Sequence, residues 1–169
     1  MKDSNKIPVE HILISLLPCH AANIYSGIKS VEFRRRKLNI SVGTIVWIYE
    51  KMPLGAITGF ATVKSLANKS PQELWELYSP VSGLSESEFF DYFINSINAY
   101  ALELEHITRL KTPATLDQLR RIKATFQPPQ FFTRLLRDDK ILLKLHDHSG
   151  KTDYSAIEHL DPRFNFLVA

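Results

Sequence analysis

Short runs of β-forming residues, separated by turn residues, constrain the fold of this chain more than any other feature. The runs are HILISLL (11–17), VEFRR (31–35), TIVWIYE (44–50), AITGFATV (56–63) and AYALELEHI (99–107). The last run alternates apolar with acidic residues, as a half-buried strand does. Gly59 indicates a bulge or a tight bend within its run. Short strands joined by tight turns favour a twisted sheet or a small barrel.

Helices are expected between these strands, because three capping-box patterns occur outside the β-forming runs. The patterns begin at Ser70, Ser85 and Thr115, and each carries Glu or Gln three residues later. They predict helices over about 71–79 and 86–95, and a short basic helix after Thr115. A further helix is expected over 18–27, where Pro18 suits the first turn and Gly27 the end. The combined pattern predicts an α+β fold.

The last third of the chain carries weaker signals. Pro128-Pro129 is followed by apolar residues at roughly helical spacing, which predicts a helix within 126–136. The run ILLKLH (141–146) predicts a final strand. The polar residues after it predict no definite element.

Composition excludes several classes of protein. A chain of 169 residues has room for one domain with a sizeable core. Its apolar runs are too short to cross a bilayer, so we expect a protein without membrane spans and without an export signal. Cys19 is the single cysteine, which excludes an intramolecular disulfide and a cysteine-based metal cluster. These features fit a cytoplasmic location.

Charge is segregated along the chain, although the net charge is only +3. Residues 1–69 carry ten Lys or Arg against four Asp or Glu, and residues 70–105 carry none against seven. Residues 106–144 again carry more basic than acidic residues, with nine Lys or Arg against three Asp or Glu. If the two basic blocks meet on one face, that face attracts polyanions, and the acidic block lies on the opposite face. If the fold intermixes the blocks, no such face exists.

The segment SGIKSVEFRRR (26–36) places a lysine, a glutamate and three arginines close together. In an extended strand Glu32 and Arg34 share one face, and Lys29 can swing toward them from the preceding turn. Such a cluster can bind a phosphate or a base edge. The lysine can also serve as a nucleophile or base if its pKa is lowered. The simplest alternative is a turn that enters a solvated, charged strand.

Other chemical motifs are weak. His146-Asp147-His148 could place two histidines on one strand face, but no third ligand is identifiable, so we expect no metal site. The chain has six glycines and no phosphate-binding glycine loop or nucleophile elbow. We therefore expect no cofactor, and any enzyme activity must depend on a few polar side chains.

The spacing Gly27-x-Lys29-x-x-Glu32-x-Arg34, after a strand and a short helix, resembles the G-x-K-x-x-E-x-R signature of the ASCH family. Pro128-Pro129-Gln130, followed by Phe131, resembles a second block of that family. The resemblance extends over roughly residues 10–136. It implies a small, mostly antiparallel PUA-like β-barrel with surrounding helices, formed by residues 1–140. Residues 141–169 are then an extension that packs on this domain or trails from it.

The resemblance also implies a cleft that takes RNA or a nucleoside-like group, lined by Lys29, Glu32 and Arg34. The residues expected to bind the ligand are Lys29, Glu32, Arg34, Arg35, Arg36, Tyr25, Gln130 and Phe131. The first functional hypothesis is a nucleic-acid-binding module that recognises a nucleotide or base in a basic cleft, linked to translation or RNA regulation. Exposed aromatic residues would stack on an unpaired base. The oligomeric state is left open.

The second hypothesis is a hydrolase, either a ribonuclease or an enzyme similar to the family's N4-acylcytidine amidohydrolases, with Lys29 and Glu32 as catalytic residues. This chain departs from the amidohydrolase pattern, because Glu32 replaces a threonine and Ser82 lies near the position of a second carboxylate. Glu86 or Glu88 could approach from the adjoining helix. In a third interpretation Lys29 and Glu32 only pair with each other, and the acidic helices contact another protein.

Overall fold

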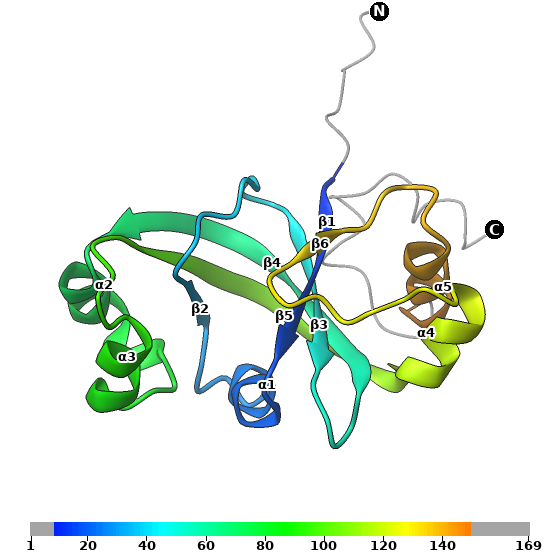
Figure 1. Cartoon of the computed structure of the whole chain (residues 1–169), viewed down its shortest axis with the longest axis horizontal. Helices are drawn as coiled ribbons and strands as arrows, with labels where there is room; N and C mark the ends of the chain where they lie inside the picture. Colours follow the sequence, from blue (N-terminus) through cyan, green and yellow to red (C-terminus); the bar gives the residue numbers. More distant parts are fainter. Residues whose placement is uncertain (1–8, 150–169) are drawn as a thin grey trace, which may run out of the picture.

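The computed structural model describes residues 9–149 (Figure 1). The strands are β1 (His11–Leu16), β2 (Val31–Arg34), β3 (Ile45–Glu50), β4 (Ala56–Lys69), β5 (Ala99–Thr115) and β6 (Thr133–Arg134). The helices are α1 (Pro18–Tyr25), α2 (Pro71–Tyr78), the 3₁₀ turn η1 (Ser79–Val81), α3 (Glu86–Tyr92), α4 (Leu116–Ile122) and α5 (Lys140–Ser149). The predicted α+β class is confirmed.

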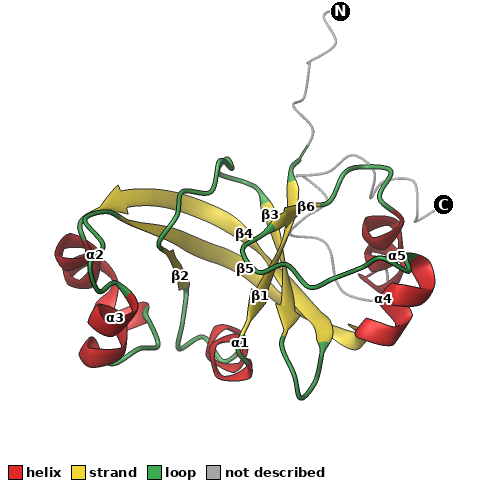
Figure 2. Cartoon of the chain, in the orientation of Figure 1, coloured by secondary structure: helices red, strands yellow, loops and turns green. Residues whose placement is uncertain are grey.

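All six described strands belong to one mixed sheet, with the order β2-β5-β4-β3-β1-β6. The pairs are antiparallel except β1 with β3, which run parallel. The sheet curls into a half-barrel with helices around it, in agreement with the predicted PUA-like architecture (Figure 2). Strands β2 and β6 are its two edges.

Strands β4 and β5 form a long hairpin that carries the curvature of the sheet. Their register shifts near Ile57, Phe60 and Val63, and such bulges bend a strand pair. Gly59 lies between the first two shifts, as its expected bend requires. A Cβ at Gly59 would lie 2.3 Å from the carbonyl oxygen of Thr108 and 2.6 Å from the hydroxyl of Tyr25. Only glycine allows this close approach of the two strands and α1.

Helices α2 and α3 cover one end of the sheet and α4 and α5 the other, with α1 between them (Figure 1). All three predicted capping boxes form, at the starts of α2, α3 and α4. Helices α2 and α3 pack Leu74, Phe89 and Phe93 against β2 and the beginning of β5. Helices α4 and α5 lie at the other end, over a second apolar cluster.

Two predicted elements in the last third of the chain are wrong. Residues 126–136 form a loop and the two-residue strand β6 instead of a helix. The reason is that Pro128-Pro129 favours extended backbone at the prolines and at the residue before them. Residues 141–146 belong to α5 instead of a strand. The buried residues Ile141, Leu142 and Leu145 follow the spacing of one helix face. A six-residue apolar run is too short for the sequence to distinguish a strand from a helix.

Helix α5 packs on the same apolar cluster as Trp47 and Phe60 of the sheet. The domain boundary near residue 140 stays a prediction, and residues 150–169 of the predicted extension lie outside the described residues. Within residues 9–149, no helix combines the length and the apolar character that crossing a membrane requires.

Candidate functional site

A cavity of about 580 Å³ lies between β2, the end of β1, α1 and α3. We call it the site cavity. Its lining residues are Ser15, Leu16, Leu17, His20, Lys29, Glu32, Phe33, Arg34, Lys51, Leu84, Glu88, Asp91, Tyr92 and Gln130. Three strands separate β2 from β1 in the sheet, so the curl of the sheet brings the two walls together. The volume is within the range of roughly 300–1,000 Å³ that holds small ligands.

Three charged side chains converge on one wall of the site cavity, and we call them the charged trio. Glu32 lies between two cations, with 3.6 Å from its Oε2 to Lys29 Nζ and 3.1 Å from its Oε1 to Arg34 Nη2. All three are buried, with exposed fractions of 2% for Lys29, 7% for Glu32 and 8% for Arg34. Buried ions are costly unless they are paired, so this arrangement requires support from its surroundings.

Lys29 is held by the turn after α1 and by the loop before α3. Gly27 ends the helix with a φ of +81°, a conformation that favours glycine, and the Lys29 amide then donates to the carbonyl of Asn23. Lys29 Nζ donates to the carbonyl oxygen of Ser82 at 3.1 Å. Gly83 follows, and a Cβ there would lie 3.1 Å from the Lys29 Cβ. The loop can therefore close on the lysine.

Arg34 links the two edges of the sheet. Its Nη1 donates to the carbonyl oxygen of Phe131 at 3.2 Å, and Phe131 lies two residues before the opposite edge strand β6. Arg134 of β6 donates in turn to the carbonyl oxygen of Asn39, in the loop after β2. Both contacts join the first basic block to the later one, so the two blocks meet at this side of the molecule.

Burial lowers the pKa of two groups in the site cavity. Desolvation lowers the pKa of Lys29 below its usual value, and the Glu32 carboxylate opposes this shift. The pKa of His20 is lowered from its usual 6.5, first by desolvation and second by the positive charge of Lys29. His20 is therefore neutral at pH 7, and the Lys29 ammonium is more acidic than an exposed lysine.

The site cavity is mixed in charge, which corrects the expectation of a basic cleft. Its wall carries the cations Lys29, Arg34 and Lys51, but also the anions Glu32, Glu88 and Asp91. Glu88 and Asp91 belong to α3, so part of the acidic block borders the cavity and does not lie only on the opposite face. A positively charged strip remains beside it, because Arg35, Arg36 and Lys37 are exposed directly after β2.

The other predicted ligand-binding residues lie in different places. Gln130 lines the site cavity, whereas Tyr25 does not. The hydroxyl of Tyr25 lies 2.7 Å from the Thr58 hydroxyl, against β4. Arg35 stacks its guanidinium 4.4 Å from the ring centroid of Tyr92, at the cavity wall. Arg36 is exposed, and Phe131 contributes its carbonyl oxygen to Arg34.

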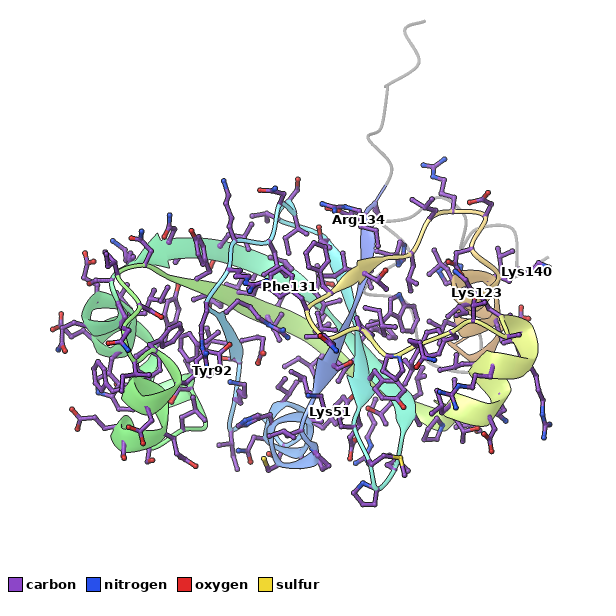
Figure 3. The ribbon with its side chains drawn as sticks, in the orientation of Figure 1. Lys51, Tyr92, Lys123, Phe131, Arg134 and Lys140 are labelled. Atoms are coloured by element: carbon purple, nitrogen blue, oxygen red, sulfur yellow. The ribbon has the colours of Figure 1, made fainter. Side chains whose placement is uncertain are left out.

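The lining residues that sequence reasoning missed include three with side chains suited to ligand contact, namely His20, Lys51 and Tyr92. Figure 3 shows Tyr92 on the α3 side of β2 and Lys51 next to α1. His20 has a local signal, because it falls in the helix that leads directly to Lys29. Lys51 and Tyr92 have none, since only the curl of the sheet and the packing of α3 bring them to the cavity.

The histidine pair near the C-terminus does not form the predicted strand face. His146 lies on α5, with its ring centroid 5.5 Å from that of His11, and the side chain of His148 lies outside the described residues. Among the residues that the structure describes, no group of three or more His, Cys, Asp or Glu side chains is arranged to hold a metal ion.

Comparisons with known proteins identify relatives of this chain. No family model matches the sequence. An ASCH domain-containing ribonuclease of Zymomonas mobilis is 38% identical over 127 residues, which cover 75% of this chain and 85% of that protein. The crystal structure of an ASCH protein from Zymomonas mobilis matches with a TM-score of 0.74 and 36% identity, over 79% of this chain and 94% of that one.

A more distant solved structure shares only the fold. The N-terminal domain of McrB from Staphylothermus marinus has a TM-score of 0.53 at 14% identity, and the match covers 85% of this chain and 99% of that one.

Proposed function

The chain belongs to the ASCH domain family, and we propose that it cleaves RNA in the site cavity. The observation that carries this proposal is the charged trio, which is buried and yet lines a cavity of ligand size. The relative from Zymomonas mobilis is named a ribonuclease, which favours RNA cleavage over the amide hydrolysis considered above. Nucleic-acid binding, the first hypothesis, then becomes the initial step of the reaction.

Stability gives no reason to retain the charged trio. A buried ion pair is often no more stable than apolar residues of the same volume, because both charges lose their hydration. The cations Lys29 and Arg34 instead suit a phosphodiester, whose negative charge replaces the lost water. Glu32 has one oxygen near each cation. We assign it the role of holding Lys29 and Arg34 in place.

His20 and Lys29 are suited to the two proton transfers of RNA cleavage. Neutral His20 accepts the proton of the ribose 2′-hydroxyl, and the 2′ oxygen attacks the adjacent phosphorus. The bond from phosphorus to the 5′ oxygen breaks, and that oxygen takes a proton from the Lys29 ammonium. The products are a 2′,3′-cyclic phosphate and a 5′-hydroxyl. The lowered pKa values of both groups favour these directions.

The test is an analysis of the ends that the protein produces. A short single-stranded RNA, the same sequence as DNA, and an RNA with 2′-O-methyl groups are incubated with the full chain. We expect cleavage of the RNA alone, with cyclic-phosphate and 5′-hydroxyl ends. The variant His20→Gln is expected to lose this activity by about 100-fold or more, because a general base contributes a factor of this order.

Arg121→Gln is the matched control, because Arg121 is exposed on α4, outside the site cavity, and its loss leaves both proton transfers intact. Ends with a 3′-hydroxyl and a 5′-phosphate would contradict the assigned proton transfers. Tight RNA binding with no cleavage at all would return the protein to the nucleic-acid-binding hypothesis.

A further inference from the structure

A second hollow of about 290 Å³ lies beside the site cavity, and the proposed cleavage step does not use it. The loop after β2 and the adjoining ends of β4 and β5 form its walls. The residues that line it are Lys37, Leu38, Asn39, Ile40, Leu66, Ala67, Asn68, Tyr100, Ala101 and Leu102.

Strand register places the second hollow on the same sheet face as the charged trio. Residues directly opposite each other in antiparallel strands point to the same face. Two rows of opposed residues cross β4, β5 and β2, and they are Asn68–Tyr100–Arg34 and Leu66–Leu102–Glu32. Each row begins at the second hollow and ends at the charged trio. The two hollows are therefore neighbours, with Arg34 and Glu32 between them.

The chemistry of the second hollow suits a nucleobase. Leu38, Leu66 and Tyr100 provide an apolar and aromatic surface, on which the flat face of a base can pack. The side-chain amides of Asn39 and Asn68 offer both donors and acceptors, as recognition of a base edge requires. Lys37 adds positive charge at the rim. A phosphate alone would find a single cation here among mostly apolar residues.

The segment between the two hollows suits the phosphates of one continuous strand. Lys29, Glu32 and Arg34 line the site cavity, and the same stretch of chain continues to Lys37 at the second hollow. Arg35 and Arg36 lie between them and are exposed. Exposed arginines at this point can pair with the backbone that connects one nucleotide to the next.

We propose that the second hollow binds the base of a nucleotide adjacent to the one in the site cavity. The inference rests on the proposed function and extends it to a substrate of at least two nucleotides. Two neighbouring bases enter separate hollows, so they are unstacked and unpaired. A base in a duplex remains stacked and paired, and it does not reach the second hollow.

The test measures binding separately from cleavage. The probe is a fluorescent single-stranded hexanucleotide with 2′-O-methyl groups, which block attack by the 2′ oxygen, and a nucleoside monophosphate is the one-nucleotide reference. Tyr100→Ala removes the aromatic wall. Leu66→Trp places a larger side chain in the hollow, and the 40% exposure of Leu66 leaves room for it. Tyr100→Phe keeps the aromatic surface, and Leu77→Trp adds the same bulk on α2, outside both hollows.

We expect Tyr100→Ala and Leu66→Trp to weaken hexanucleotide binding by about fivefold or more, the effect of losing about 1 kcal/mol of stacking on one base. Affinity for the monophosphate is expected to stay within twofold. Leu77→Trp is expected to bind both probes like the wild type, and Tyr100→Phe is expected to retain the stacking that Tyr100→Ala loses. Thermal unfolding of each variant checks that the fold is intact.

Equal affinities of the wild type, Tyr100→Ala and Leu66→Trp for the hexanucleotide would overturn the inference. An equal loss for hexanucleotide and monophosphate would overturn it too, because the hollow would then hold the single nucleotide. Both results are independent of cleavage. If Tyr100→Ala and Leu66→Trp selectively weaken hexanucleotide binding while the wild type cleaves no RNA, the inference about the second hollow is supported and only the cleavage proposal fails.

Discussion

The two ends of the sheet differ in whether charged side chains are buried there. At the end covered by α4 and α5, Trp47, Phe60 and Leu145 belong to an apolar cluster. At the end formed by β2, α1 and α3, the buried residues that line the site cavity include the charged Lys29, Glu32 and Arg34 beside the apolar Leu16 and Phe33. The first end gains free energy from every apolar group that it buries. The second end loses the hydration of three charges, and their mutual attraction recovers only part of that free energy.

This difference separates the roles of the two ends. Substitutions at the apolar end are expected to act on the fraction of folded protein. The charged end is retained at a cost, so substitutions there are expected to act on function first.

Replacement of Lys29 by alanine is expected to have the largest effect. The variant loses the proton donor and a phosphate-binding cation, so its rate of RNA cleavage should fall by about 100- to 10,000-fold. Lys29→Arg keeps the charge, but its pKa is too high for donation, so it should restore binding without restoring the rate. Single-turnover cleavage and RNA binding are the measurements. Cleavage by Lys29→Ala at the wild-type rate would remove the lysine from the mechanism.

Removal of Glu32 alone tests the cost of the charged end. Glu32→Leu leaves Lys29 and Arg34 buried without their carboxylate, and it should lower the free energy of unfolding by about 3–5 kcal/mol. In the triple variant, Lys29→Met and Arg34→Met accompany Glu32→Leu, so no buried charge remains. This protein should regain most of the lost stability and have no activity, as measured by urea unfolding and RNA cleavage.

A triple variant less stable than Glu32→Leu would show that the buried charges stabilise the fold, and it would contradict the view that they are retained at a cost.

The matching substitution at the apolar end is Leu145→Ala. Leu145 is fully buried on α5, so its truncation should lower the free energy of unfolding by about 2–5 kcal/mol. The rate of RNA cleavage per folded molecule should stay unchanged, because α5 does not border the site cavity. Leu143→Ala, at an exposed position on the same helix, is the control and should change stability little. A lower rate of RNA cleavage by fully folded Leu145→Ala would mean that the two ends are coupled.

The pH dependence of cleavage should follow the two lowered pKa values. His20 must be neutral, so activity is lost as the pH falls through a folded pKa that lies below 6.5. Lys29 must be protonated, so activity is lost as the pH rises through a folded pKa that lies below 10.5. The result is a bell-shaped profile with a tenfold change per pH unit on each limb. Loss of the alkaline limb in Lys29→Arg would confirm its assignment, and an unchanged limb would contradict it.

Tyr25→Phe should have the smallest effect at neutral pH. It removes the hydroxyl that faces Thr58, which contributes about 1 kcal/mol, and cleavage should continue because Tyr25 lies outside the site cavity. Burial raises the pKa of Tyr25 to about 12. The folded state therefore favours the neutral phenol, and this stability is lost as the pH rises from 10 to 12. Urea unfolding across this range should show a smaller decline in Tyr25→Phe than in the wild type.

The strands and most helices could be predicted from the sequence because their signals are local. Capping boxes at Ser70, Ser85 and Thr115 depend on residues three apart, and all three form. The failures at 126–136 and 141–146 have different causes. In the first segment Pro128-Pro129 favours extended backbone over a helix. In the second, a six-residue apolar run is too short to distinguish strand from helix, and contacts with distant parts of the chain decide between them.

The site was predictable only in part. Lys29, Glu32 and Arg34 are near neighbours in the chain, so a turn and a short strand suffice to bring them together. The carbonyl of Ser82, which holds Lys29, lies 53 residues away from it. The carbonyl of Phe131, which holds Arg34, lies 97 residues away. No local pattern indicates either partner.

The amino-acid sequence by itself determined where the strands alternate, where the capped helices begin, and which three charged residues lie together after the first helix. Those features depend on interactions within a few residues along the chain. The tertiary structure alone decided that these charges are buried, that the acidic helix α3 borders them, and that two hollows flank them. Burial and cavities depend on how the sheet curls and which distant segments meet, and only the folded chain fixes that arrangement.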